Sequence, residues 1–176
     1  MSALSKEHLE IAKRIEELNN YVSSSLTLVE AKHASFVALL LVFLSGVLEL
    51  EFSKMKSLST LFFLLSVIEL LICMGISLWA LYPRASGKRK YKTTSCERLL
   101  FRCETLEELS KEQLQELLKK DCSTYRFSEY EQAKIESLLN ASKAAARKYR
   151  LFRCSLQCFA VFIVCFLLLI LSYILL

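Results

Sequence analysis

One acidic side chain stands alone in a hydrophobic stretch, and its position suggests chemistry more directly than any other in this chain. Glu69 lies near the middle of the run 58–82 and is its only carboxylate. An acidic residue at the bilayer centre costs on the order of 2.5 to 3.5 kcal/mol, so it usually faces a helix interface or a water-filled path. Two interpretations stay open. Glu69 lines a pore or acts as a proton-sensitive switch, or it is protonated and hydrogen-bonded to a neighbouring helix near Ser45 or Ser66.

Basic side chains offer a second kind of chemistry, the binding of an anion. They gather after residue 82 and before residue 157, at Arg84, Lys88, Arg89, Lys90, Lys92, Arg98, Lys143, Arg147, Lys148, Arg150 and Arg153. Lys and Arg next to a membrane span set its topology and attract anionic lipid, which is one interpretation. The other is a phosphate site, because three of these cations and one from the leading helix are expected at one membrane level on three helices: Arg84, Lys88 and Lys148, with Lys32.

Catalytic and metal chemistry has little support. The chain has two histidines, His8 and His33, which are far apart in sequence and do not form a Ser/His/Asp set, and no glycine-rich phosphate loop is present. None of the seven cysteines is spaced as Cys-x-x-Cys, and small apolar packing is their expected role. We therefore expect no enzyme activity, no catalytic residue, no metal site and no tightly bound cofactor.

The elements that position these side chains follow from composition. Hydrophobic residues make up 54% of the 176 residues and charged residues 23%, with three glycines and one proline, which favours long helices with few turns. The excess is concentrated in three runs of roughly 20 residues, the length of a membrane-spanning helix. The sequence predicts an all-α integral membrane protein with three transmembrane helices, at 35–52, 58–82 and 157–176.

Orientation follows from the distribution of positive charge. Most Lys and Arg residues lie in 83–156, so this helical region and the leading helix 1–34 are placed in the cytoplasm. The resulting expectation is a multi-pass inner-membrane protein with a cytoplasmic N-terminus and its C-terminus at the outer face. The net charge of +5 is too small to argue for a nucleic acid polymer as partner.

Two of the three spans are expected to continue into a cytoplasmic helical stalk. Apolar residues recur at heptad-like spacing before the first span, favouring one helix from about Ser5 to Phe52. A second stripe favours a helix from Ser128 into the last span, at Ile135, Leu138, Ser142, Ala145, Tyr149, Phe152 and Leu156. Capping boxes are predicted at Thr94 and Glu97, Ser110 and Gln113, and Ser128 and Glu131. Because such stripes bury little within one chain, we expect a homo-oligomer.

Three short motifs resemble those of a known family. They are Glu30-Ala31-Lys32-His33-Ala34-Ser35 at the entry to the first span, Pro83-Arg84 after the second, and Lys148-Tyr149 before the third, preceded by Leu138-Leu139. Their order resembles the transmembrane effectors of Pycsar, a bacterial antiphage system. In this system a cyclase makes a cyclic pyrimidine nucleotide that triggers a membrane-damaging protein. His33 stands where the family usually has a small residue. The leading hairpin is also similar to that of the SLATT family.

The resemblance implies a function. It implies an antiphage effector that oligomerises in the inner membrane and disrupts or permeabilises it, causing growth arrest or cell death, when cyclic UMP or cyclic CMP from a partner cyclase binds. The expected ligand-binding residues are Lys32, Arg84, Lys88, Lys148 and Tyr149. Two alternatives remain: a SLATT-type pore effector with a different trigger, and a non-conducting membrane scaffold that recruits a partner protein.

Overall fold

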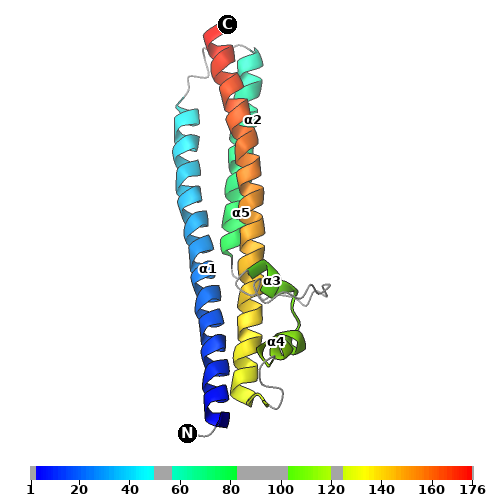
Figure 1. Cartoon of the computed structure of the whole chain (residues 1–176). Helices are drawn as coiled ribbons and strands as arrows, with labels where there is room; N and C mark the ends of the chain where they lie inside the picture. Colours follow the sequence, from blue (N-terminus) through cyan, green and yellow to red (C-terminus); the bar gives the residue numbers. More distant parts are fainter. Residues whose placement is uncertain (1–2, 50–56, 83–102, 120–124, 176) are drawn as a thin grey trace. The chain divides into compact units, whose positions relative to one another are not determined.

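The described part of the chain is built from α-helices and contains no strand. The computed structural model describes residues 3–49, 57–82, 103–119 and 125–175. Its helices are α1 (Ala3–Leu48), α2 (Ser57–Leu81), α3 (Cys103–Glu108), α4 (Lys111–Leu118) and α5 (Glu129–Leu175) (Figure 1). Of these, α1, α2 and α5 are long and apolar enough to cross a membrane. The predicted all-α class with three candidate spans, two of them in long helices, is confirmed.

Capping boxes begin two of these helices, as predicted. At α4, Gln113 N donates to Ser110 Oγ at 3.2 Å, and Ser110 N donates to Gln113 Oε1 at 2.9 Å. At α5, Glu131 N donates to Ser128 Oγ at 3.3 Å, and Ser128 N donates to Glu131 Oε2 at 2.8 Å. Each box satisfies N–H groups that the first helical turn leaves without partners. The third predicted box, at Thr94 and Glu97, lies outside the described residues.

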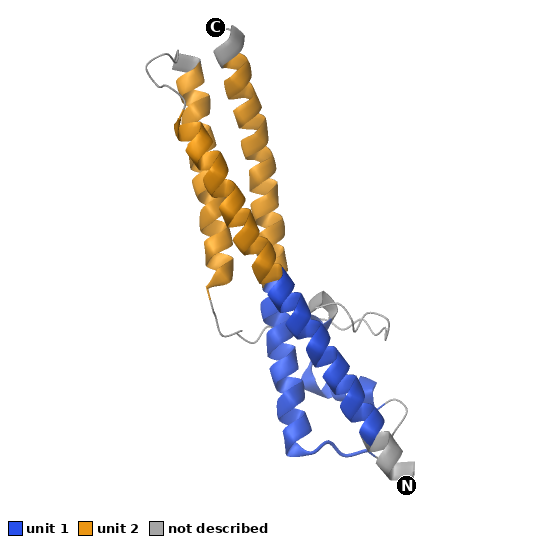
Figure 2. Ribbon diagram, turned by 90° about the vertical axis from the view of Figure 1, so that its left-hand side faces the viewer, with its two compact units in different colours: residues 1–28, 84–147 blue, residues 29–83, 148–176 orange. Residues whose placement is uncertain are grey.

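The helices divide between two compact units, shown in different colours in Figure 2. Unit 1 comprises residues 1–28 and 84–147, and its core joins one stripe of α1 to α5, α3 and α4. The α1 stripe is the predicted one, with Ile11, Ile15, Leu18 and Val22 all buried. The other helices, the connection between α3 and α4, and the segment before α5 add Leu106, Leu109, Leu114, Leu118, Tyr125, Phe127, Ile135, Leu138, Leu139, Ala145 and Ala146.

Unit 2 comprises Val29–Pro83 and Lys148–Leu176 and packs the apolar parts of α1, α2 and α5. Between α1 and α5 the contact is aromatic: the Phe36 and Phe159 rings meet edge to face at 5.3 Å, and the Phe43 and Phe162 rings do so at 5.5 Å. Edge-to-face geometry is the favoured arrangement of aromatic pairs.

Between α2 and α5 the contact in unit 2 is partly polar. Ser77 Oγ lies 2.9 Å from Ser155 Oγ, and Ser155 Oγ also donates to Cys73 O at 3.1 Å. At the other end of the pair, Ser172 Oγ donates to Ser59 Oγ at 3.1 Å. Small residues of this kind let two membrane helices approach closely and exchange hydrogen bonds.

The predicted stripe of α5 needs one correction. Leu156 was expected to continue it, but Leu156 is exposed and Ser155 is buried. Ser155 is buried because α2 packs on that side of α5, where Ser77 and the Cys73 carbonyl bond the Ser155 hydroxyl. Leu156 lies about 100° further around the helix and is not covered by this contact.

Truncating a side chain in the core of unit 1 tests this packing. Leu138 is 1% exposed, so Leu138→Ala should destabilise unit 1 by about 2 to 5 kcal/mol through lost burial and a residual cavity. In the detergent-solubilised full chain, this loss of stability should appear as faster hydrogen exchange of the α4 backbone amides. Leu9→Ala is the matched control, because Leu9 is 67% exposed and should change exchange little.

Candidate functional site

Charged and aromatic side chains from α1 and α5 meet in unit 2, next to the first residues of its aromatic core. On α1 the residues are Glu30, Lys32 and His33, and on α5 they are Lys148 and Tyr149. One helical turn further along each helix, Phe36 and Phe152 pack their rings edge to face at 5.9 Å. A change in the polar contacts would therefore act directly on the packing of the two apolar helices.

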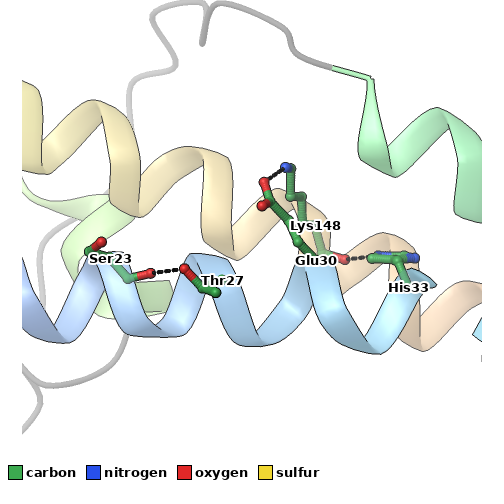
Figure 3. Close-up of polar contacts among 5 residues, drawn as sticks. All are labelled: Ser23, Thr27, Glu30, His33 and Lys148. Carbon is green, nitrogen blue, oxygen red and sulfur yellow. Dashed lines mark hydrogen bonds and ion pairs between the residues drawn. The ribbon is translucent and has the colours of Figure 1, made fainter. Parts of the chain in front are cut away.

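An ion pair joins the two helices at this point. Lys148 Nζ donates to Glu30 Oε1, as Figure 3 shows. The Lys148 side chain is 13% exposed and that of Glu30 is 45% exposed. A charge this well covered is costly to leave without a counterion, whereas the Glu30 carboxylate can be hydrated. Lys148 therefore depends on an anion more than Glu30 depends on a cation.

His33 is fully buried beside this pair. Its Nε2 lies 3.1 Å from Lys148 O, and because a carbonyl only accepts, Nε2 carries the hydrogen and donates. Within the described residues its Nδ1 has no hydrogen-bond partner. A ring that donates through Nε2 and leaves Nδ1 as a bare acceptor is the neutral imidazole. The ring also packs edge to face on Phe152 at 5.2 Å.

Burial controls the acid–base behaviour of His33, which precedes the first residue predicted to enter the bilayer. Burial is the largest cause that lowers its pKa, the bond to the Lys148 carbonyl opposes this, and the charge of Lys148 adds to the lowering. Protonation would put a second positive charge beside Lys148. His33 is thus a neutral packing residue that fixes the α1–α5 contact.

The second cation of the site is accessible. Lys32 Nζ lies 5.7 Å from the centroid of the Tyr149 ring, within the range of a cation–π contact. Lys32 is exposed and Tyr149 is half-buried. Lys32 is therefore open to solvent, whereas the Lys148 ammonium group is already paired with Glu30.

Of the five predicted ligand-binding residues, the structure places three on the contact between α1 and α5: Lys32 beside Tyr149, and Lys148 paired with Glu30. Arg84 and Lys88 lie outside the described residues, and binding of a ligand stays a prediction. The sequence interpretation missed two members, His33 and Glu30. The spacing of Val29, His33 and Phe36 continues the buried stripe of α1 and could have identified His33. Glu30 begins the motif that carries the family resemblance, but no sequence spacing pairs it with Lys148, which is 118 positions away.

Glu69 lies on α2 and is half-buried. Along α2 it precedes the buried Cys73 by about one helical turn. No hydrogen bond to Glu69 occurs among the residues that the structure describes, where Ser66 Oγ donates to Phe62 O at 2.9 Å and Ser45 is exposed. Neither serine proposed as its partner therefore bonds it within the chain. Pore lining by Glu69 stays a prediction.

The buried His33 gives the folded state a specific response to acid. Its folded pKa is lowered below 6.5, so stability is full above pH 6.5 and falls as the pH drops from there toward the folded pKa. We expect the melting temperature of the solubilised chain to fall more between about pH 7.5 and about pH 5.5 than that of His33→Gln, whose amide can still donate to the Lys148 carbonyl. Equal losses in the two proteins would contradict this role.

Comparison with known proteins places the chain in a family. The profile of the family described as Pycsar effector protein domain matches residues 14–176. The comparison with curated proteins found no match. The comparison with solved structures found none either. Because the matched segment includes all three apolar helices and the charged site, the chain belongs to the Pycsar effector protein domain family and is an antiphage defence effector.

Proposed function

We propose that this protein permeabilises the bacterial inner membrane as a homo-oligomer when a cyclic pyrimidine nucleotide, cyclic UMP or cyclic CMP, binds near the cytoplasmic ends of its spans. The trigger would come from a partner cyclase, and the outcome would be growth arrest or death of the infected cell. Membership of the Pycsar effector family supports the link to nucleotide signalling. Three helices long and apolar enough to cross a membrane support the site of action.

The observation that carries the proposal is the position of the charged site. Lys32, Lys148 and Tyr149 lie where the aromatic contact between α1 and α5 begins, at Phe36 and Phe152. The two lysines suit a cyclic phosphate, and the Tyr149 ring offers a face on which a pyrimidine base can stack. Binding and the packing of the spans would then depend on the same two helices.

A mechanism follows from competition for Lys148. A phosphate that reaches Lys148 displaces Glu30, and the α1–α5 contact loses its ion pair. A ligand shifts a conformational equilibrium only by its difference in affinity for the two states. The nucleotide would therefore favour an arrangement in which Lys32 and Lys148 both face the phosphate, and this arrangement would be the conducting one.

Thermal stabilisation tests the ligand. At a nucleotide concentration 100 times its Kd, the solubilised full chain should gain about 2.7 kcal/mol of stability, seen as a raised melting temperature. We expect this with cyclic CMP or cyclic UMP and not with cyclic AMP or cyclic GMP. Lys148→Ala and Lys32→Ala should lose the shift.

The control for this experiment is Lys13→Ala, which removes an exposed cation of unit 1 that pairs with Glu17 along the same helix. It should keep the full shift. If no nucleotide stabilises the wild-type chain, direct gating by a nucleotide is wrong and the trigger is a partner protein or a change in the membrane.

A second experiment tests the membrane activity. Overexpression should slow growth and admit a membrane-impermeant dye, and Glu69→Gln should change both, because the only carboxylate in the apolar run of α2 would be lost. Leu71→Gln is the matched control, since it places the same amide on an exposed position of the same helix. If the protein is a non-conducting scaffold, cells should grow normally while overexpressing the wild type or either variant, and no dye should enter them.

A further inference from the structure

Two polar side chains of unit 2, Ser45 and Glu69, lie at least partly on the outer surface of the apolar helices. Ser45 lies on the side of α1 opposite the buried residues Leu40 and Val47, and Glu69 is half-buried on α2. Large apolar side chains flank both: Leu41, Val42 and Leu48 around Ser45, and Leu65 and Ile72 around Glu69. Hydrocarbon offers neither group a hydrogen-bond partner, so leaving them against lipid is costly.

The two groups lie at the same level along the helices, measured against α5. The ring of Phe43 contacts the rings of Phe159 and Phe162, which places Ser45, two residues further on, level with Phe162 and Ile163. On the antiparallel helix α2, Ser77 contacts Ser155 and Ser59 contacts Ser172. Glu69 is near the midpoint between these two contacts, which is again level with Phe162 and Ile163. Their heights agree within about one helical turn, ~5 Å.

The two groups also face different sides of the helix set. α1 packs against the phenylalanine side of α5, at Phe152 and Phe159. Glu69 lies on α2, which packs against the serine side of α5, at Ser155 and Ser172. Ser45 faces away from the core on α1. Within one chain, the two groups are therefore separated by the packed helices.

The surface around Ser45 allows close approach by another helix. The next residue is Gly46, and a Cβ added there would meet nothing within 4 Å. Ser45 and Gly46 are both exposed and both small, so a second helix can come close to α1 at this height. Small residues at such positions are where membrane helices pack most closely and where polar side chains bond across the contact.

The geometry points to a second copy of this chain as the occupant of both surfaces: Ser45 of one copy donates a hydrogen bond to the Glu69 carboxyl of the next. Because the two surfaces differ, the contact is head to tail, and repeating it in the plane of a membrane gives a row of copies that becomes a ring where the rotation closes. The inference rests on the oligomer in the proposed function and names its interface. It also assigns Glu69 to the contact between copies, beside any water path that the ring encloses.

Disulfide cross-linking tests this contact in membranes that contain the full chain. The variant carries Ser45→Cys and Ile72→Cys, one turn from Glu69, in a background without the seven native cysteines. Oxidation should give a ladder of dimers, trimers and larger species. Each single variant should stay monomeric, and the two single variants expressed together should stop at a dimer. Membranes are tested without nucleotide and with cyclic CMP or cyclic UMP.

The matched control replaces Ile72→Cys by Leu71→Cys, which is also exposed but points to another side of α2. It should give no ladder. A ladder from the control, dimers from a single variant, or monomers in every condition would each overturn the head-to-tail contact.

A second measurement does not depend on the cysteine-free background. In liposomes, Ser45→Ala and Glu69→Leu should each weaken self-association about 3- to 20-fold, and the double variant should be no weaker than the worse single variant. Additive losses would overturn a direct bond. If the variants weaken self-association as expected but the wild-type protein admits no dye, the contact between copies stands and the proposed permeabilisation is wrong. Failure of the contact and failure of the proposed function can therefore be told apart.

Discussion

The pairing of α1 with α5 is the interaction on which the rest of the structure depends. In unit 1 these helices supply most of the buried side chains, and in unit 2 they contribute the aromatic core. At the first residues of unit 2 the contact between the two helices is polar. Glu30 accepts a hydrogen bond from the ammonium group of Lys148, and His33 donates one to the backbone carbonyl of Lys148. A contact between two helices that includes a charge can be opened by another charge, which a purely apolar contact does not allow.

The third helix is held by a different kind of contact. α2 meets α5 through serines, and their hydroxyls bond each other or a backbone carbonyl. The hydroxyls of Ser59, Ser77, Ser155 and Ser172 are buried and bonded in this contact. The charged contact of unit 2 thus joins α1 to α5, whereas the serine contact joins α2 to α5.

The family and the structure describe different properties of this protein. The family identifies the response as antiphage defence and does not name a residue that performs it. The structure shows that the Lys148 side chain is 13% exposed and that Glu30 supplies its counterion. In the proposed function, a phosphate competes with the Glu30 carboxylate for Lys148.

The sequence by itself determined the features that depend on neighbouring residues. Helix caps at Ser110 and Ser128, the buried stripe from Ile11 to Val22 and the three apolar helices follow from spacings of three or four positions and from run length. Only the tertiary structure decided which residues of distant helices meet. It placed Glu30 on Lys148, left Ser45 and Glu69 apart, and turned Ser155 inward in place of Leu156. These outcomes depend on how each helix is rotated about its axis and which helix it packs against, which is set by the summed packing of whole faces and not by any short motif.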